Sequence, residues 1–307
     1  MEHNDIDFRK TVRLIEEARD RLDEASEILG AFNTGDMSGR NTIADKAWSI
    51  DRNIADIRAI AKHMGAEMTD RLIAIDLDNT FADYTTAFAD CLAQMGRPVR
   101  GGDPTTYDFG CDGWFGEGNG DVFPEFHSRA VMLGLYLRER PYPHARRAVD
   151  TLTFDHPAWH VAFVTSRRDD GDDTARWMLG LGIDMSLEFD YANQCLDHMD
   201  PTGMELGRAV SERARSGRWS MGLLSEPNGV GWCHLPDKES LEADLYIEDD
   251  PAMLDRLMDL GLPVLVRRHA YNTAQCERAM RSDVRGAVFD DWTQVPGLAE
   301  RLIGGSH

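Results

Sequence analysis

Residues 72–80 read Leu-Ile-Ala-Ile-Asp-Leu-Asp-Asn-Thr, an apolar run that leads into two aspartates two positions apart. A short run of this kind is typical of a strand buried on both faces of a parallel sheet. Asp76 and Asp78 would then follow the strand, where one carboxylate can attack a substrate while the other moves a proton. The plainer interpretation is a polar turn after a strand, because Asp and Asn favour turns.

Four further segments have the same apolar character and predict additional strands. They are residues 160–164, 243–247, 263–266 and 286–289. Helical patterns lie between them, for example at residues 143–152, 172–181 and 252–260. This alternation predicts an α/β fold with a doubly wound, parallel, Rossmann-like sheet and right-handed crossovers.

Polar side chains follow three of the five predicted strands. Besides the two aspartates, Thr165 and Ser166 follow the second strand, and residues 248–250 (Glu-Asp-Asp) follow the third. Sheets of this type carry their active sites at the carboxyl ends of the strands. The coincidence of three polar strand ends indicates an active site more strongly than any single motif.

The first 70 residues predict a separate helical unit. Two stretches of apolar residues at helical spacing flank a turn-rich run at residues 33–40, so residues 1–70 are expected to form a helical hairpin. Amphipathic helices of this kind are unstable alone in water. We therefore expect the hairpin to pack on the main domain or to join two copies of the chain in a homodimer.

The remaining segments predict a core that is interrupted twice. Residues 85–140 begin helically and become rich in glycine and aromatic residues, which predicts an inserted, mainly helical cap. The α/β core would then consist of residues 71–84 and 141–307. Residues 184–228 predict a second insertion with one helix at 204–215.

The composition is that of an acidic globular protein. The hydrophobic share of 42% is ordinary for a packed domain, and the net charge of −21 argues against nucleic acid or an acidic membrane as a partner. No apolar run approaches the length of a membrane span and the first residues are polar, so we expect a cytoplasmic location. The five cysteines include no CxxC pair, which argues against a zinc site or a disulfide framework.

Lysine usage draws attention to Lys238. The chain has 33 lysines and arginines, but only four are lysines, and Lys238 is the only one after Lys62. A lysine is by default a surface residue. This one lies eleven positions before Asp249 and just ahead of a predicted strand, which favours a functional role.

Four motifs together resemble those of the haloacid dehalogenase superfamily of phosphohydrolases. Residues 76–80 (Asp-Leu-Asp-Asn-Thr) resemble its first motif, Thr165 its second, Lys238 its third and residues 248–251 (Glu-Asp-Asp-Pro) its fourth. The motifs occur in the family's order, and the resemblance covers about residues 71–290. The predicted hairpin lies outside it.

The resemblance implies a role for each of these side chains. Asp76 would attack phosphorus and form an aspartyl-phosphate, while Asp78 would protonate the leaving oxygen and later deprotonate water. Thr165 and Ser166 would bind the phosphoryl group. Lys238 would offset the charge of the phosphate and of Asp76.

The resemblance also implies a Mg²⁺ site. Asp76, the backbone carbonyl of Asp78, and Asp249 would hold the ion, with Glu248 in place of the family's usual Asp. The need for a cation also follows from charge alone, because four carboxylates on neighbouring strand ends would repel one another. Asn79 stands where the family often has glycine, and Asn tolerates the backbone conformation this requires.

Within the superfamily, four segments resemble the deoxyribonucleotidase branch, which removes phosphate from nucleoside monophosphates. They are the start of the cap after Asp83, residues 107–109 (Tyr-Asp-Phe), residues 140–143 (Arg-Pro-Tyr-Pro) and residues 246–251 (Tyr-Ile-Glu-Asp-Asp-Pro). The implied activity is a Mg²⁺-dependent 5′-nucleotidase acting on a small phosphorylated substrate. The alternatives are a phosphatase of a sugar phosphate or other small metabolite, and a non-catalytic binding or assembly module.

Aromatic residues of the cap suggest how a nucleobase would be held. The candidates are Tyr107, Phe109, Trp114 and Phe115. Such rings can stack on any base, but they can equally form the cap's own small core. Arg167 and Arg168 pose a similar choice, because they could contact phosphate or lie exposed to solvent.

Overall fold

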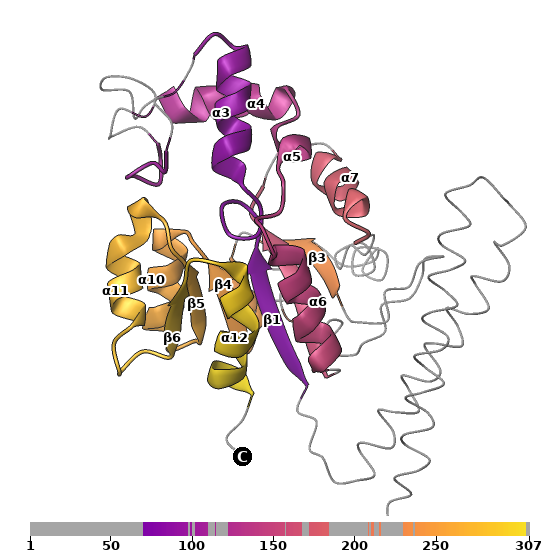
Figure 1. Ribbon diagram of the computed structural model, residues 1–307, viewed down its shortest axis with the longest axis vertical. Helices are drawn as coiled ribbons and strands as arrows, with labels where there is room; N and C mark the ends of the chain where they lie inside the picture. Colours follow the sequence, from indigo (N-terminus) through magenta and orange to yellow (C-terminus); the bar gives the residue numbers. More distant parts are fainter. Residues whose placement is uncertain are drawn as a thin grey trace, which may run out of the picture. The chain divides into compact units, whose positions relative to one another are not determined.

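A computed structural model describes most of the chain after residue 69 (Figure 1). The described residues are 70–97, 99, 102–109, 114, 122–156, 158–167, 172–183, 208, 210, 211, 215, 230–235 and 237–304. The expected hairpin therefore lies outside the described residues, apart from residue 70. So does nearly all of the insertion expected at 184–228.

The core is a six-stranded sheet in the order β3-β2-β1-β4-β5-β6, and every neighbouring pair is parallel. The strands are β1 (Arg71–Asp76), β2 (Trp159–Thr165), β3 (Val230–His234), β4 (Leu245–Glu248), β5 (Val264–Arg267) and β6 (Gly286–Phe289). The predicted α/β fold with a parallel, Rossmann-like sheet is confirmed. The edge strand β3 was not predicted from the sequence.

The order of the strands creates a switch point beside β1. From β1 the chain steps outward to β2 and β3, then returns to the other side of β1 and steps outward through β4, β5 and β6. A crevice forms at the carboxyl ends of the strands where the winding direction changes, and ligands of such sheets bind there. In this chain the crevice lies between the ends of β1 and β4, which carry Asp76 and Glu248.

Helices cover both faces of the sheet because β1 is apolar on both sides. The helices of the core are α6 (Ala145–Asp155), α7 (Asp173–Gly180), α10 (Pro251–Asp259), α11 (Thr273–Ala279) and α12 (Val295–Ile303). Ile73 and Ile75 pack in one buried cluster with α6 and α12, which lie in front of the sheet in Figure 1. Leu72 and Ala74 pack in the other with α10 and α11. Because successive side chains of a strand point to opposite faces, β1 contributes to a hydrophobic core on each side of the sheet.

The segment expected as a cap contains α3 (Tyr84–Gln94), α4 (Phe123–Met132) and α5 (Leu135–Arg138), which stand above the sheet in Figure 1. Its buried residues form a hydrophobic cluster of their own. The two chain segments that join it to the core run side by side. The Asp83 N–H donates to the Arg140 carbonyl at 2.9 Å, and Ala82 forms an antiparallel bridge with Pro141. We call this segment the cap and residues 139–141 the return linker.

Phe109 and Trp114 belong to the core of the cap. Both rings are buried, and both contact Phe88 and each other. Of the two roles expected for the cap aromatics, these two rings therefore form the core of the cap. Tyr107 is 47% exposed, and its ring contacts Tyr271 edge-on. Phe115 lies outside the described residues.

Among the described helices, none is both long and apolar enough to cross a membrane.

Candidate active site

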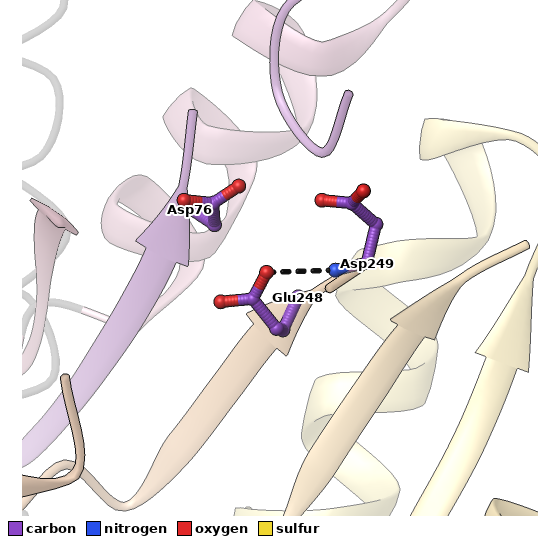
Figure 2. Close-up of side chains that lie close together, drawn as sticks. All are labelled: Asp76, Glu248 and Asp249. Carbon is purple, nitrogen blue, oxygen red and sulfur yellow. Dashed lines mark hydrogen bonds between the residues drawn. The ribbon is translucent and has the colours of Figure 1, made fainter. Parts of the chain in front are cut away.

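Asp76 is the last residue of β1 and sits at the switch point of the sheet. Its side chain is buried, and it accepts a hydrogen bond from Lys238 Nζ at 2.5 Å. Figure 2 shows its carboxylate in the gap between β1 and β4, near Glu248 and Asp249. The end of β1, the segment that precedes β4 and the end of β4 thus meet at Asp76.

Lys238 begins the short helix η3 (Lys238–Leu241), which precedes β4. Its ammonium group lies between two carboxylates, donating to Asp76 and, at 2.7 Å, to Glu248 Oε2. Burial acts against the charged form of the lysine, but the two carboxylates outweigh it and raise the pKa of Lys238. This lysine is not a surface residue.

Glu248 is held by backbone amides as well as by Lys238. Its Oε1 accepts the N–H groups of Asp249 and Asp250 at 3.0 and 3.1 Å, and the first of these bonds is drawn in Figure 2. The next residue, Asp250, is the N-cap of α10 and accepts the N–H groups of Ala252 and Met253. The acidic motif therefore caps a helix and lines the crevice at the same time.

Two hydroxyl groups hold the carboxylate of Asp249. Thr80 Oγ1 donates to its Oδ1 at 2.5 Å, and the Tyr271 hydroxyl donates to its Oδ2 at 2.5 Å. Asn272 fixes the backbone at this position by donating to the Asp249 carbonyl. Tyr271 and Asn272 lie just after β5 and were not singled out from the sequence.

Asp76, Glu248 and Asp249 form a buried cluster in which one carboxylate oxygen from each residue lies within 4.8 Å of the other two. Burial is the main cause that raises the pKa of each carboxyl group to about 7, and repulsion within the cluster adds to it. Among the described residues, Lys238 is the one lysine or arginine paired with this cluster, and it contacts only two of the three carboxylates, so charge remains uncompensated. Hard oxygen donors in this number suit Mg²⁺, and carboxylate oxygens that already accept one hydrogen bond keep a second lone pair. The residues present therefore fit a divalent cation.

The side chain of Asp78 pairs with a different cation. Its Oδ1 accepts from Arg167 Nε at 3.0 Å and from Arg167 Nη2 at 2.5 Å. Arg167 also donates to Glu139 Oε2 at 2.7 Å, and its side chain is fully buried. Of the two alternatives for Arg167, exposure to solvent is wrong, because two carboxylates hold the side chain inside the protein. Arg168 lies outside the described residues.

Thr165 is the last residue of β2 and Ser166 follows it, beside the end of β1. The register places Asp76 opposite Val164, the residue before Thr165. The buried Thr165 hydroxyl accepts the N–H of Arg167 at 3.2 Å and can still donate its own proton. Ser166 is exposed and lines the cavity described below.

The loop between Asp78 and Thr80 depends on a left-handed residue. Asn79 has φ of 57°, a conformation that Asn tolerates better than most residues. Its side-chain oxygen accepts the N–H and the hydroxyl of Thr85, which fixes the loop against the start of α3. His269 Nε2 lies 2.8 Å from the Asn79 carbonyl and holds the loop from the other side.

A cavity of about 610 Å³ lies between the cap and the loop that carries Asp78. Its described lining residues are Asp78, Asn79, Tyr84, Tyr107, Phe109, Phe123, His127, Ser128, Val131, Met132, Tyr136, Ser166 and Arg167. One wall is polar: the hydroxyls of Tyr84 and Tyr136 lie 2.8 and 3.3 Å from the two ring nitrogens of His127. Burial lowers the pKa of His127, so the wall is uncharged at neutral pH.

Comparison with known proteins yields no relative in sequence and several weak likenesses in structure. No family model matches the chain, and no curated protein matches it. Among solved structures, a haloacid dehalogenase-like hydrolase from Streptococcus pneumoniae has a TM-score of 0.40 at 12% identity, covering 74% of this chain and 97% of its own. A predicted phosphoglycolate phosphatase from Haemophilus somnus has a TM-score of 0.39 at 16% identity, with coverages of 76% and 99%.

CbbY from Rhodobacter sphaeroides, solved in complex with phosphate, has a TM-score of 0.36 at 12% identity, with coverages of 74% and 96%. These likenesses give no support for the deoxyribonucleotidase branch. A likeness at such identities and scores does not extend to activity or substrate.

Proposed function

We propose that this protein is a Mg²⁺-dependent phosphomonoesterase in which Asp76 is the nucleophile. The observation that carries the proposal is the convergence at the switch point, where the buried Asp76 contacts Lys238 and lies within 4.8 Å of Glu248 and Asp249. A carboxylate held beside a buried cation and a cation-binding cluster is arranged to meet a phosphate dianion. Phosphoryl transfer depends mainly on such positioning and charge compensation.

In the proposed reaction, Asp76 attacks phosphorus and the alcohol leaves from the opposite side. Asp78 faces the cavity, where it can protonate the leaving oxygen. It can then take a proton from the water that attacks the aspartyl-phosphate, which breaks the bond to Asp76, restores its carboxylate and releases phosphate. Thr165 donates its hydroxyl to a phosphoryl oxygen, and Lys238 offsets the charge on Asp76. A bound Mg²⁺, held by Asp76, Asp249 and the Asp78 carbonyl with Glu248 nearby, would supply further charge neutralisation.

The leaving group is proposed to occupy the cavity under the cap. A volume of about 610 Å³ is in the range of small-molecule sites. Among the described lining residues, Arg167 is the one Arg or Lys, and two carboxylates already hold it. A leaving group that carries a second phosphate or a carboxylate would find no unpaired arginine or lysine among these described residues. The wall therefore favours an uncharged alcohol.

A nucleoside is our first choice for this alcohol, because Tyr107 offers a partly exposed ring at the cavity for a base to stack on. The second candidate is a sugar. The polar wall of Tyr84, His127, Ser128 and Tyr136 favours it, since these groups can exchange hydrogen bonds with several hydroxyls.

The test is phosphate release by the purified full chain with Mg²⁺, alongside the variant Asp76→Asn. The panel contains p-nitrophenyl phosphate, purine and pyrimidine nucleoside monophosphates, and pentose and hexose phosphates. We expect the largest kcat/KM on a nucleoside monophosphate and a loss of at least about 10⁴-fold in Asp76→Asn.

Three outcomes would contradict parts of this proposal. No release from any substrate, with the variant and the natural chain equally folded, overturns the enzymatic function in favour of a non-catalytic module. Release that persists in Asp76→Asn overturns the mechanism. Activity confined to sugar phosphates replaces the nucleoside with the sugar.

A further inference from the structure

Arg167 connects the proposed acid–base residue to the cap. It lies just after β2, and its guanidinium group bridges Asp78 with Glu139, which begins the return linker. The side chains of Arg167 and Glu139 are both fully buried. Arg167, a residue of the core, thus uses one guanidinium group to hold both Asp78 of the site and Glu139 of the return linker.

The guanidinium group is fixed on its faces as well as its edges. It lies 4.2 Å from the centre of the Tyr136 ring and 5.5 Å from that of Trp177. Trp177 in turn donates its ring N–H to the Glu139 carbonyl at 2.9 Å. Stacking of this kind and a two-pronged fork are properties of arginine that lysine lacks.

Arg167 has little capacity left to bind a substrate. Nε and Nη2 donate to Asp78, Nη2 also donates to Glu139, and Nη1 donates to Thr174 Oγ1 at 3.4 Å. A guanidinium group has five N–H bonds, so these four contacts leave one. A phosphate-binding arginine usually offers two parallel N–H groups to the same anion. The geometry does not suit that role.

We propose that Arg167, seated by Glu139, is a positioning residue that keeps the Asp78 carboxylate directed at the leaving group. This inference rests on the proposed phosphomonoesterase function. Asp78 is only two positions from Asp76, so without Arg167 its carboxylate would be drawn to Lys238 or to a cation bound in the cluster. Because Glu139 belongs to the return linker, the orientation of the Asp78 side chain also depends on the position of the cap.

The role can be separated from a purely structural one by varying the leaving group. Proton donation matters most when the departing alcohol is weakly acidic, and least when it leaves readily as an anion. The series is p-nitrophenyl, phenyl and alkyl phosphate, and the measured quantity is kcat/KM with Mg²⁺. We expect Arg167→Met to lose less than about 5-fold on p-nitrophenyl phosphate and about 100-fold on the alkyl phosphate. Asp78→Asn should show the same pattern.

Two further variants make the experiment decisive. Glu139→Gln keeps the shape of the linker but weakens the hold on Arg167, so we expect the same gradient with smaller losses. Arg281→Met removes an exposed arginine that pairs with Asp283 and should change no substrate by more than about 2-fold. If Arg167→Met does not fold, Glu139→Gln carries the test alone.

The results separate this inference from the proposed function. A natural chain that releases no phosphate from any substrate overturns the proposed function. An active natural chain whose Arg167→Met and Glu139→Gln variants lose the same factor on every substrate overturns only the positioning role. A gradient in these variants that matches Asp78→Asn supports it.

Discussion

The site contains two buried arrangements that look alike and are built for different purposes. In the first, Lys238 lies between Asp76 and Glu248 at the switch point of the sheet. In the second, Arg167 lies between Asp78 and Glu139 at the junction of core and cap. Each places one cation between two carboxylates. They differ in the shape of the cation and in what stands nearby.

That difference explains why we propose different roles for the two arrangements. The ammonium group of lysine is a compact point charge, and a third carboxylate, Asp249, leaves its cluster short of positive charge. Such a cluster suits the proposed binding of a metal ion and a phosphate. The arginine fork instead donates to both carboxylates and to Thr174, and it stacks on Tyr136. It holds a side chain in place rather than attracting a ligand.

The largest effect is expected from Lys238→Met. This change leaves Asp76 and Glu248 buried without a partner, which should lower the free energy of unfolding by about 3–5 kcal/mol. It should lower kcat/KM by at least about 10³-fold on every substrate, p-nitrophenyl phosphate included. Urea unfolding and phosphate release measure the two effects.

The matched variant is Arg167→Met. This change leaves one buried carboxylate, Glu139, without its partner, whereas Lys238→Met leaves two, and Asp78 is 32% exposed and can be hydrated. The loss of stability should therefore be smaller than for Lys238→Met. Its activity on p-nitrophenyl phosphate should survive. If the two variants lose activity in parallel across substrates, the distinction between the two arrangements is wrong.

The next largest effect is expected from Mg²⁺ binding, which should involve the cluster around Lys238 and not the Arg167 arrangement. Mg²⁺ at about 100 times its dissociation constant stabilises a folded protein by about 2.7 kcal/mol, which corresponds to roughly 5–10 °C in Tm for a domain of this size. We expect this shift in the natural chain after EDTA treatment and Mg²⁺ addition. Asp249→Asn should abolish it, because that carboxylate belongs to the cluster.

Asp78→Asn and Arg167→Met should keep the Mg²⁺ shift, since neither change alters a side chain of the cluster. Thermal unfolding with Mg²⁺ and with Ca²⁺ gives the comparison. A natural chain whose Tm is the same in EDTA and in saturating Mg²⁺ would contradict the metal site.

A smaller effect is expected from Thr80→Val. Thr80 donates to Asp249 within the cluster, and both side chains are buried. Loss of a buried hydrogen bond to a charged group should lower the free energy of unfolding by about 2 kcal/mol. Thr86→Val removes an exposed hydroxyl that donates to Asp83, and it should cost less than about 0.5 kcal/mol. Equal losses in urea unfolding would show that Asp249 does not depend on Thr80.

The smallest effect concerns His269, which supports the loop that links the two arrangements. Its ring nitrogens face two acceptors, the Asn79 carbonyl and the carboxylate of Asp103. Burial opposes its charge, but the hydrogen bond to Asp103 and the nearby Asp249 raise the pKa of His269. The same hydrogen bond is the main cause that lowers the pKa of Asp103.

A raised histidine pKa gives stability that is full below its unfolded value of about 6.5 and is lost as the pH rises through the folded value. The natural chain should therefore lose up to about 1 kcal/mol of stability relative to His269→Gln between pH 6 and 9, since Asp103 is half exposed. Urea unfolding across this range measures it. Parallel pH profiles for the two proteins would exclude a charged His269.

The sequence predicted five of the six strands, and it failed at β3 for a physical reason. Residues 230–234 read Val-Gly-Trp-Cys-His, which lacks the continuous aliphatic character of β1 and contains a glycine. What makes this segment a strand is its pairing with β2 on the edge of the sheet. That partner is distant in the chain, so local pattern could not reveal it.

Arg167 and Glu139 show the same limit within the site. Residues 167 and 168 are adjacent arginines, and nothing in the sequence distinguishes them. The burial of Arg167 comes from Glu139, which is 28 positions away, and from the rings of Tyr136 and Trp177. Exposure of a charged residue is decided by which partners the fold supplies, and spacing along the chain carries little information about it.

The amino-acid sequence by itself determined the parallel sheet and the place of the acidic residues at the carboxyl ends of its strands. Apolar runs bury strands wherever they occur, and parallel pairing brings their carboxyl ends to one edge. The association of Asp76 with Lys238 and the acidic cluster was expected from the motifs, but only the tertiary structure decided that the Asp78 side chain pairs with Arg167 and, through it, with Glu139 of the return linker. Two aspartates two residues apart are chemically identical in the chain. Their directions differ because the charges that hold them come from distant elements that only folding brings together.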